Sequence, residues 1–145
     1  MPWELDSDRP IYAQIVDRLK HEIVSGFYPP GSRLPSVRDL AAQASVNPNT
    51  MQKAFTELER TGLIVTRRTS GRTVTEDTAL IEQVRSELAE LQISQFLTRM
   101  QHLGYQKDDS IRLLLVKRRK IHDTDIRYPA PPAGRQQALR QKNSA

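Results

Sequence analysis

The sequence predicts a mainly α-helical fold with one small β-hairpin. Between Ile11 and Val24, apolar residues recur at the spacing of a helix that buries one side. Two further segments open with residues that cap helices, and a short strand-forming segment with three arginines follows them. These observations predict a helix, a short helix, a turn, a longer helix and a hairpin, in that order.

The first helix is expected to begin at Pro10 and to end at Gly26, where a turn rich in proline and glycine follows. The second helix is expected after Ser36, because Asp39 stands three residues later in the pattern of a capping box. The apolar side of this short helix consists of Val37, Leu40, Ala41 and Ala44.

The third helix has the clearest start signal in the chain. Asn47 is a good N-cap and Pro48 suits the first helical position, whereas Gly62 is expected to stop the helix. Unpaired backbone N–H groups at such a helix start attract anions, and phosphate is the obvious anion. One face carries Met51, Phe55 and Leu58, and another carries Asn49, Gln52, Lys53 and Thr56.

A hairpin is predicted after the third helix. Residues 63–66 favour a strand, residues 67–72 a turn, and residues 73–75 a return strand. Two helices joined by a short turn could form a plain helical hairpin, but the arginine-tipped hairpin favours a winged helix-turn-helix. We therefore assign residues 1–75 to a winged helix-turn-helix domain that binds DNA.

A helical segment is predicted to follow this domain. Residues 76–103 favour a long amphipathic helix that ends at Gly104, and another helix is expected to begin at Asp108 or Ser110. We assign residues 76–116 to dimerisation, because the winged domain is too small to cover the whole apolar stripe, although the stripe could fold back on it. The predicted dimerisation residues are Leu80, Val84, Leu88, Leu91, Phe96 and Met100.

The basic segment 117–145 is expected to be disordered. Its first four residues, KRRK, are either a solvated end or a non-specific anchor for DNA or a membrane surface. No membrane is expected as a partner, because no apolar run approaches the roughly 18 residues of a membrane helix. An acidic N-terminus without a signal peptide favours the cytoplasm.

Composition argues against an enzyme. Hydrophobic residues make up 37% of the 145 residues, and the mean hydropathy is -0.60, which fits a modest core. Cysteine is absent and the three histidines are scattered, so neither a disulfide nor a metal site is expected. The sequence contains no nucleophile–base arrangement and no glycine-rich phosphate loop, so we also expect no cofactor.

The net charge of +5 is unevenly distributed along the chain. Residues 33–75 contain seven basic and three acidic side chains, and residues 112–145 contain nine and two. Residues 76–111, with three basic and seven acidic side chains, separate these two basic blocks. Basic blocks of this kind indicate contact with nucleic acid.

Four segments together resemble the GntR family of bacterial transcription regulators. They are residues 10–15 (PIYAQI), 30–41 (PGSRLPSVRDLA), 46–50 (VNPNT) and 58–64 (LERTGLI). The Asn-Pro-Asn-Thr form and the short C-terminal part are similar to the YtrA-type subfamily. The resemblance extends from residue 3 to about residue 115. It implies a homodimer that binds a near-palindromic operator in double-stranded DNA, usually as a repressor, and often at neighbouring ABC transporter genes.

The same resemblance implies DNA contacts from Arg38, with Ser36 beside it, and from the polar start of the third helix. The wing departs from the family pattern Arg-Gly-x-Gly-Thr-Phe-Val, because Thr69 replaces the first glycine and Thr73 replaces the aromatic residue. The complete predicted DNA-binding set is Ser36, Arg38, Asn47, Pro48, Asn49, Thr50, Gln52, Lys53, Arg67, Arg68, Gly71 and Arg72.

The chemistry of three of these residues suits DNA. Arg38 can contact a phosphate or a guanine, and Gln52 can pair with adenine in the major groove. Lys53 is expected to hold a phosphate. Arg38 and Gln52 could instead be solvated surface side chains, and Lys53 could instead read a base.

The sequence therefore indicates a sequence-specific transcriptional regulator. The alternative is a winged-helix module that binds a protein partner, or one that binds DNA without sequence preference. The segment after residue 75 is too short to enclose a sizeable ligand pocket. Any small-molecule effector is therefore expected at the dimer interface, or between that interface and the winged domain.

Overall fold

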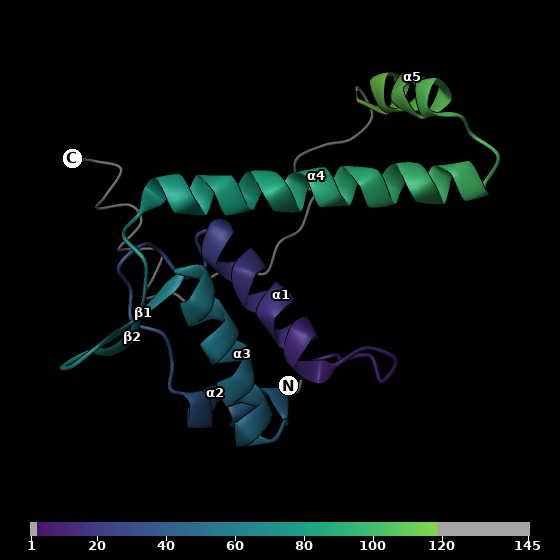
Figure 1. Cartoon of the computed structure of the whole chain (residues 1–145). Helices are drawn as coiled ribbons and strands as arrows, with labels where there is room; N and C mark the ends of the chain where they lie inside the picture. The colour runs from purple at the N-terminus through teal and green to yellow at the C-terminus, as the bar shows by residue number, and fades with distance from the viewer. Residues whose placement is uncertain (1–2, 119–145) are drawn as a thin grey trace. The chain divides into compact units, whose positions relative to one another are not determined.

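In the computed structural model, residues 3–118 are described, and they form five helices and one two-stranded antiparallel sheet (Figure 1). These residues divide into two compact units, residues 3–85 and residues 86–118. The predicted fold class is confirmed, because the order of elements in the first unit is that of a winged helix-turn-helix. No helix within the described part of the chain has the length and apolarity needed to cross a membrane.

Three helices form the first unit's scaffold, and their ends follow local capping chemistry. The hydroxyl of Ser36 accepts a hydrogen bond from the backbone N–H of Asp39 at 3.0 Å, and the side chain of Asn47 accepts one from Asn49 at 2.8 Å. Gly62 ends the third helix with φ of 85°, in the left-handed region that favours glycine. The predicted starts and stop are confirmed for α1 (Ile11–Val24), α2 (Val37–Ala44) and α3 (Pro48–Thr61).

The core of the first unit lies where α3 packs against α1 and α2 (Figure 1). Phe55 is fully buried there, and burial of a side chain of this size contributes about 1.5–3 kcal/mol. The apolar faces predicted for the three helices are the buried ones. Their innermost members are Ile15, Leu19 and Ile23 of α1, Leu40 of α2, and Met51, Phe55 and Leu58 of α3.

The wing is an antiparallel hairpin of β1 (Ile64–Arg67) and β2 (Gly71–Val74). The predicted six-residue turn was too long, because Arg67 and Arg72 lie in the strands and only residues 68–70 connect them. Its strand pairs continue almost to the tip: Thr66 lies opposite Arg72, and Arg67 lies opposite Gly71.

A short extended segment pairs with the outer edge of β2, and the sequence did not predict it. The N–H of Leu34 donates to the carbonyl of Arg72, the N–H of Val74 donates to that of Ser32, both at 2.9 Å, and Arg33 bridges to Thr73. Prolines and a glycine surround this segment, so its local pattern is that of a turn. Pairing with β2 nevertheless ties the wing to the chain that leads into α2.

Helix α4 (Thr78–His102) contributes its first turns to the first unit. Ile81 and Val84 are buried there, and the guanidinium of Arg85 donates to the carbonyl of Val24 at 2.7 and 3.1 Å. Leu80 packs beside Gly62, where an added Cβ atom would lie 3.3 Å from it. Val84, one of the predicted dimerisation residues, is therefore already covered by its own unit.

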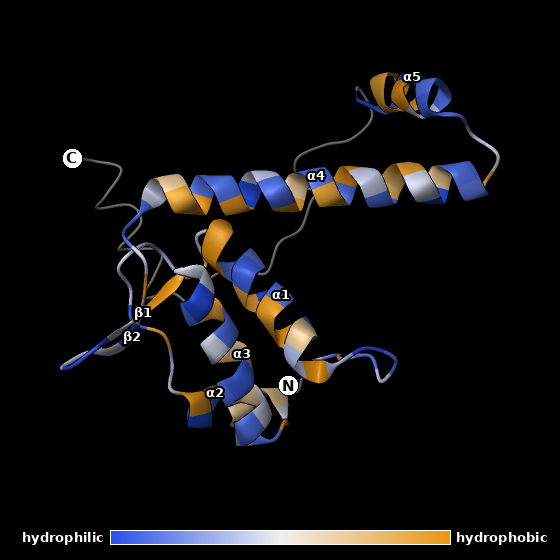
Figure 2. Cartoon of the chain, in the orientation of Figure 1, coloured by the Kyte–Doolittle hydropathy of each residue, from blue (hydrophilic) through white to orange (hydrophobic). Residues whose placement is uncertain are grey.

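The second unit consists of the remainder of α4 together with α5 (Lys107–Lys117). Helix α5 begins earlier than the predicted Asp108 or Ser110, because Gln106 and Asp109 form a reciprocal capping box. Figure 2 shows apolar residues on α5 and along α4. Large apolar side chains that remain exposed are Leu91, Ile93, Leu103, Ile111, Leu114, Leu115 and Val116. The segment predicted to be disordered, residues 117–145, begins too early, because Lys117 is the last residue of α5; residues 119–145 lie outside the described residues.

Candidate nucleic-acid interface

The start of α3 presents a polar surface. Asn47, Pro48 and Asn49 are exposed, and Thr50 is half-buried. Unpaired N–H groups were expected here, but Asn47 accepts hydrogen bonds from the backbone N–H groups that follow it. Its side-chain oxygen binds Asn49, and its carbonyl accepts from Thr50 at 3.0 Å and from Met51 at 3.1 Å. A phosphate at this helix end would therefore meet side chains and the helix dipole rather than free N–H donors.

Arg38 is an exposed side chain on α2. Within residues 3–118, no hydrogen bond or ion pair engages its guanidinium, so all five of its N–H donors remain available. Ser36, two residues earlier, has a full structural role as the cap of α2. Of this predicted pair, Arg38 is the residue whose side chain is free to contact a nucleic acid.

Lys53 and Gln52 leave α3 in different environments. The Nζ atom of Lys53 lies 3.9 Å from the ring centroid of Tyr12, so α1 holds this ammonium through a cation–π contact. The amide of Gln52 points toward the wing, where its oxygen accepts from Arg72 at 3.4 Å. Both side chains are exposed, yet each has an intramolecular partner.

The three wing arginines differ in what holds them. Arg67 and Arg68 are exposed near the tip, and Gly71 begins β2 with φ of 72°. Arg72 is instead turned back onto α3, where its Nε lies 2.5 Å from Oε1 of Glu59. Only 27% of the Arg72 side chain is exposed. The wing therefore offers two arginines to a partner, whereas three were predicted.

Glu59 is the polar residue at this site that the sequence analysis missed. The hydrogen bond from Arg72 is the main cause that lowers the pKa of Glu59. Partial burial acts in the opposite direction, and a hydrogen bond from Thr66 makes a smaller contribution to the lowering. Its carboxylate is therefore charged at neutral pH. One signal was present in the sequence: Glu59 stands seven residues after Gln52, on the same face of a helix.

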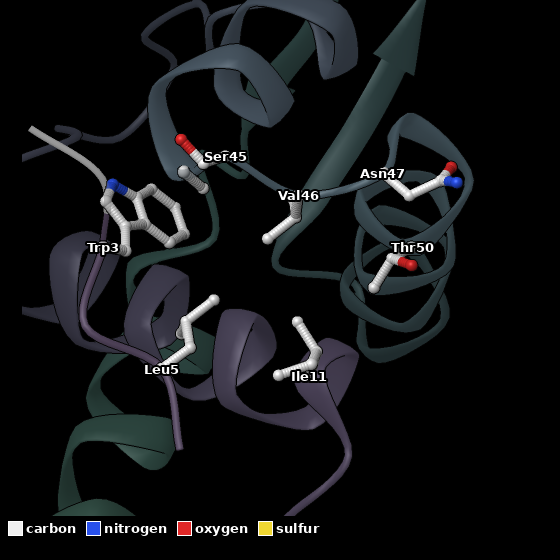
Figure 3. Close-up of a pocket in the computed structure, with 8 residues that line it drawn as sticks. Trp3, Leu5, Ile11, Ser45, Val46, Asn47 and Thr50 are labelled. Atoms are coloured by element: carbon white, nitrogen blue, oxygen red, sulfur yellow. The ribbon is translucent and has the colours of Figure 1, made fainter. Parts of the chain in front are cut away.

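A hollow of about 380 Å³ lies beside the turn between α2 and α3 (Figure 3). Trp3, Leu5 and Ile11 face it from one side, and Val46 points into it from the turn. Asn47 forms part of the rim, so the hollow borders the polar start of α3. It was not predicted, because it depends on how the N-terminal segment lies against the turn. The other lining residues are Ala44, Ser45 and Thr50.

Metal ligation finds no support among residues 3–118. No group of three or more histidine, aspartate or glutamate side chains there could hold an ion.

Residues 11–74 match the family model described as bacterial regulatory proteins, gntR family. The HTH-type transcriptional regulator YhcF of Bacillus subtilis (strain 168) is 35% identical over 108 residues, which cover 74% of this chain and 89% of YhcF. The HTH-type transcriptional repressor YtrA of the same organism is 39% identical over 102 residues, or 69% of this chain and 78% of YtrA.

A solved GntR family transcriptional regulator from Listeria monocytogenes has a similar structure. Its TM-score is 0.70 at 40% identity, and the match covers 81% of this chain and 100% of that one. These relatives are transcriptional regulators and not enzymes, which agrees with the class that the sequence predicted.

Proposed function

Because this chain belongs to the GntR family of bacterial regulatory proteins and is of the YtrA type, we propose that it represses transcription by binding a palindromic operator as a homodimer. Members of the family are DNA-binding transcriptional regulators. The observation that most strongly supports operator recognition here is the exposed polar start of α3 beside the unpaired Arg38. Two basic residues of the wing, Arg67 and Arg68, extend this surface.

We propose the following division of roles among the predicted DNA-binding residues. Asn49 and Gln52 read base edges in the major groove, because their amides offer both a donor and an acceptor. Arg38 contacts a phosphate or a guanine, and the two exposed wing arginines hold phosphates. Asn47, Pro48 and Ser36 shape the helix ends that present these side chains, while Thr50, Lys53 and Gly71 support the surface around them.

Repression is supported by one relative, and a homodimer by the exposed side chains of the second unit. The relative YtrA is described as a repressor. Exposed apolar side chains on α4 and α5 need a partner surface, and a second copy of the chain supplies one. Two copies related by a two-fold axis would read the two halves of a palindrome. The YtrA-type assignment also leads us to propose neighbouring ABC transporter genes as the regulated genes, and the cytoplasm as the location.

The sequence led us to expect any small-molecule effector at the dimer interface or between that interface and the winged domain, but we propose instead that it acts at the hollow beside the α2–α3 turn. Its lining is mainly apolar, with Ser45, Asn47 and Thr50 as the polar members, and its volume falls within the range of ligand pockets. Trp3 is the chain's single tryptophan, so its fluorescence reports on the hollow directly. A ligand would regulate only if it bound the DNA-bound and the DNA-free protein with different affinities. Operator DNA should therefore change the affinity of the protein for the ligand.

The test of the main proposal is footprinting on the DNA upstream of the protein's own gene. We expect protection over one two-fold symmetric site. An excess of unlabelled DNA with that site should abolish the protection, whereas an excess of random duplex should not. Equal affinity for random duplex would contradict the proposal. It would favour the alternative of a module that binds DNA without sequence preference.

Arg38→Ala tests the site itself. We expect this variant to lose specific binding but to sediment as the wild type does. Within residues 3–118, the guanidinium of Arg38 makes no hydrogen bond or ion pair, so its removal should leave the fold intact. Arg60→Ala is the matched control, since it removes the same charge from the last turn of α3. Unchanged operator affinity for Arg38→Ala would remove Arg38 from the interface.

A further inference from the structure

Glu59 joins the third helix to both strands of the wing at a single rung. Its Oε1 atom accepts a hydrogen bond from Nε of Arg72 at 2.5 Å and another from the hydroxyl of Thr66 at 3.0 Å. Thr66 and Arg72 lie directly opposite each other in the hairpin. One carboxylate thus holds β1 and β2 against the helix.

Arg72 extends this contact along α3 toward the predicted base reader. Its Nη2 donates to Oε1 of Gln52 at 3.4 Å, and its guanidinium carbon lies 5.3 Å from the ring centroid of Phe55. Residues 52, 55 and 59 share one side of the helix, because they are spaced by three and four. Nε2 of Gln52 donates to the hydroxyl of Thr56, also at 3.4 Å.

We propose that Glu59 and Arg72 are positioning residues that together set how Gln52 reads DNA. Glu59 also keeps Arg72 away from the phosphates. The inference rests on the proposed function, since it concerns the same reading surface. It assigns Arg72 a role different from that of Arg67 and Arg68. We call the Glu59–Arg72–Gln52 contact the wing lock.

The wing lock has two physical consequences. Because a guanidinium only donates hydrogen bonds, it fixes the amide of Gln52 with its oxygen toward the wing and its NH₂ group away from it. A fixed amide discriminates between bases, whereas a free amide rotates to suit either a donor or an acceptor. The ion pair also neutralises Arg72, so this arginine adds nothing to the salt-dependent attraction for DNA.

Breaking the lock should therefore increase non-specific attraction while it lowers specificity. In Glu59→Gln, Arg72 is released to a phosphate, and the slope of log affinity against log salt should steepen by about 0.9 per half-site. Discrimination at the base pair next to Gln52 should fall by about fivefold or more, the lower range for one bidentate contact. The measurement is binding of the full chain to its footprinted site and to single-base variants across a salt series.

Glu57→Gln is the matched control, because Glu57 also lies on α3 and pairs with one arginine, Arg60, but does not contact the wing. It should leave both the slope and the discrimination near the wild-type values. The double variant Glu59→Gln with Arg72→Gln should regain the wild-type slope while its discrimination stays low. If Glu59→Gln behaves as Glu57→Gln does, or if the double variant keeps the steeper slope, the proposal is overturned.

A measurement without DNA separates this inference from the proposed function. In wild-type protein, the Nε–H proton of Arg72 should give a slowly exchanging NMR signal, which Glu59→Gln removes and Glu57→Gln retains. Absence of that signal in the wild type would overturn the lock. A protected Nε–H together with equal binding to all duplexes would instead overturn the proposed function. Arg72→Gln breaks the same contact from the strand side, so a poorly folded Glu59→Gln does not leave the lock untested.

Discussion

Ser45 ends α2 in a left-handed conformation, with φ of 56° and ψ of 45°. Residues with a Cβ atom pay about 1–2 kcal/mol to adopt this region, and glycine does not. Glycine adds about 0.4–1 kcal/mol of entropy to the unfolded chain, which offsets part of the gain. We therefore expect Ser45→Gly to raise the free energy of unfolding by up to about 1 kcal/mol, measured by urea denaturation.

The control for this change is Ser25→Gly. Ser25 caps the end of α1 with φ of -80°, a right-handed conformation that any residue adopts. Its hydroxyl also donates to the carbonyl of Glu22 at 3.3 Å. Glycine should destabilise the protein here by about 0.5–1 kcal/mol. If the two substitutions changed stability in the same direction, backbone strain at Ser45 would not be the cause.

Glu59 makes the free energy of unfolding depend on pH in the acid range. Its pKa is lower in the folded chain than in the unfolded chain, first because Arg72 donates to the carboxylate. The stabilisation is therefore fully present above the unfolded value, about 4.3, and is lost as the pH falls through the lower folded value. Urea unfolding of wild type and Glu59→Gln between pH 3 and 7 should give curves that differ at neutral pH and converge as the pH falls below the unfolded value. A constant difference across the range would show that ionisation of Glu59 does not contribute.

At the scale of elements, local signals were sufficient for the helices of the first unit but not for strand pairing. Asn47, Pro48 and Gly62 act on their immediate neighbours, so the bounds of α3 could be predicted from the sequence. The extended segment before α2 pairs through Ser32 and Leu34 with residues about 40 positions away, and nothing in its composition encodes that partner. The early start of α5 was missed because glutamine is an uncommon cap.

Arg85 connects α4 to the end of α1 through the carbonyl of Val24. This carbonyl belongs to the last turn of α1, where the helix supplies no partner of its own. Arg85→Ala would leave it with fewer hydrogen bonds in a largely covered position. We expect a loss of about 1.5–3 kcal/mol, the range for a hydrogen bond to a charged group, seen as a lower urea midpoint.

Arg99→Ala is the comparison for this variant, because Arg99 lies on an exposed part of the same helix. It removes an equal charge and should change stability by less than about 0.5 kcal/mol. Equal effects of the two substitutions would mean that charge, and not the bond to α1, determines the loss.

At the scale of the whole molecule, the family and the winged fold could be predicted because their motifs are local and specific. The wing lock could not, since Glu59 and Arg72 are 13 residues apart and meet only through the register of the hairpin. The sequence contains three arginines in one segment, and from it all three were predicted to bind DNA. Side-chain geometry separates Arg72 from Arg67 and Arg68, because pairing depends on which side of a strand a residue occupies.

Dimerisation is the prediction that belongs to the whole molecule, and the exposed part of the α4 stripe is where it can be tested. Val84 is covered by its own unit, whereas Leu91 is 51% exposed and Leu88, three residues earlier, is half-buried. We expect Leu88→Glu with Leu91→Glu to give a monomer in sedimentation, because two carboxylates in an apolar interface lose their hydration. The free energy of unfolding of the winged domain should change little.

The matched control is Ala79→Glu with Ser86→Glu. At 100° per residue, these exposed positions lie on the opposite side of α4 from Leu88, and they add the same two charges. This variant should remain dimeric and should footprint as the wild type does. The monomeric variant should bind one half-site far more weakly than the dimer binds the whole operator, because linkage raises the effective concentration of the second half. A dimer that persists with both glutamates on the stripe would refute this interface and leave α5 as the surface to examine.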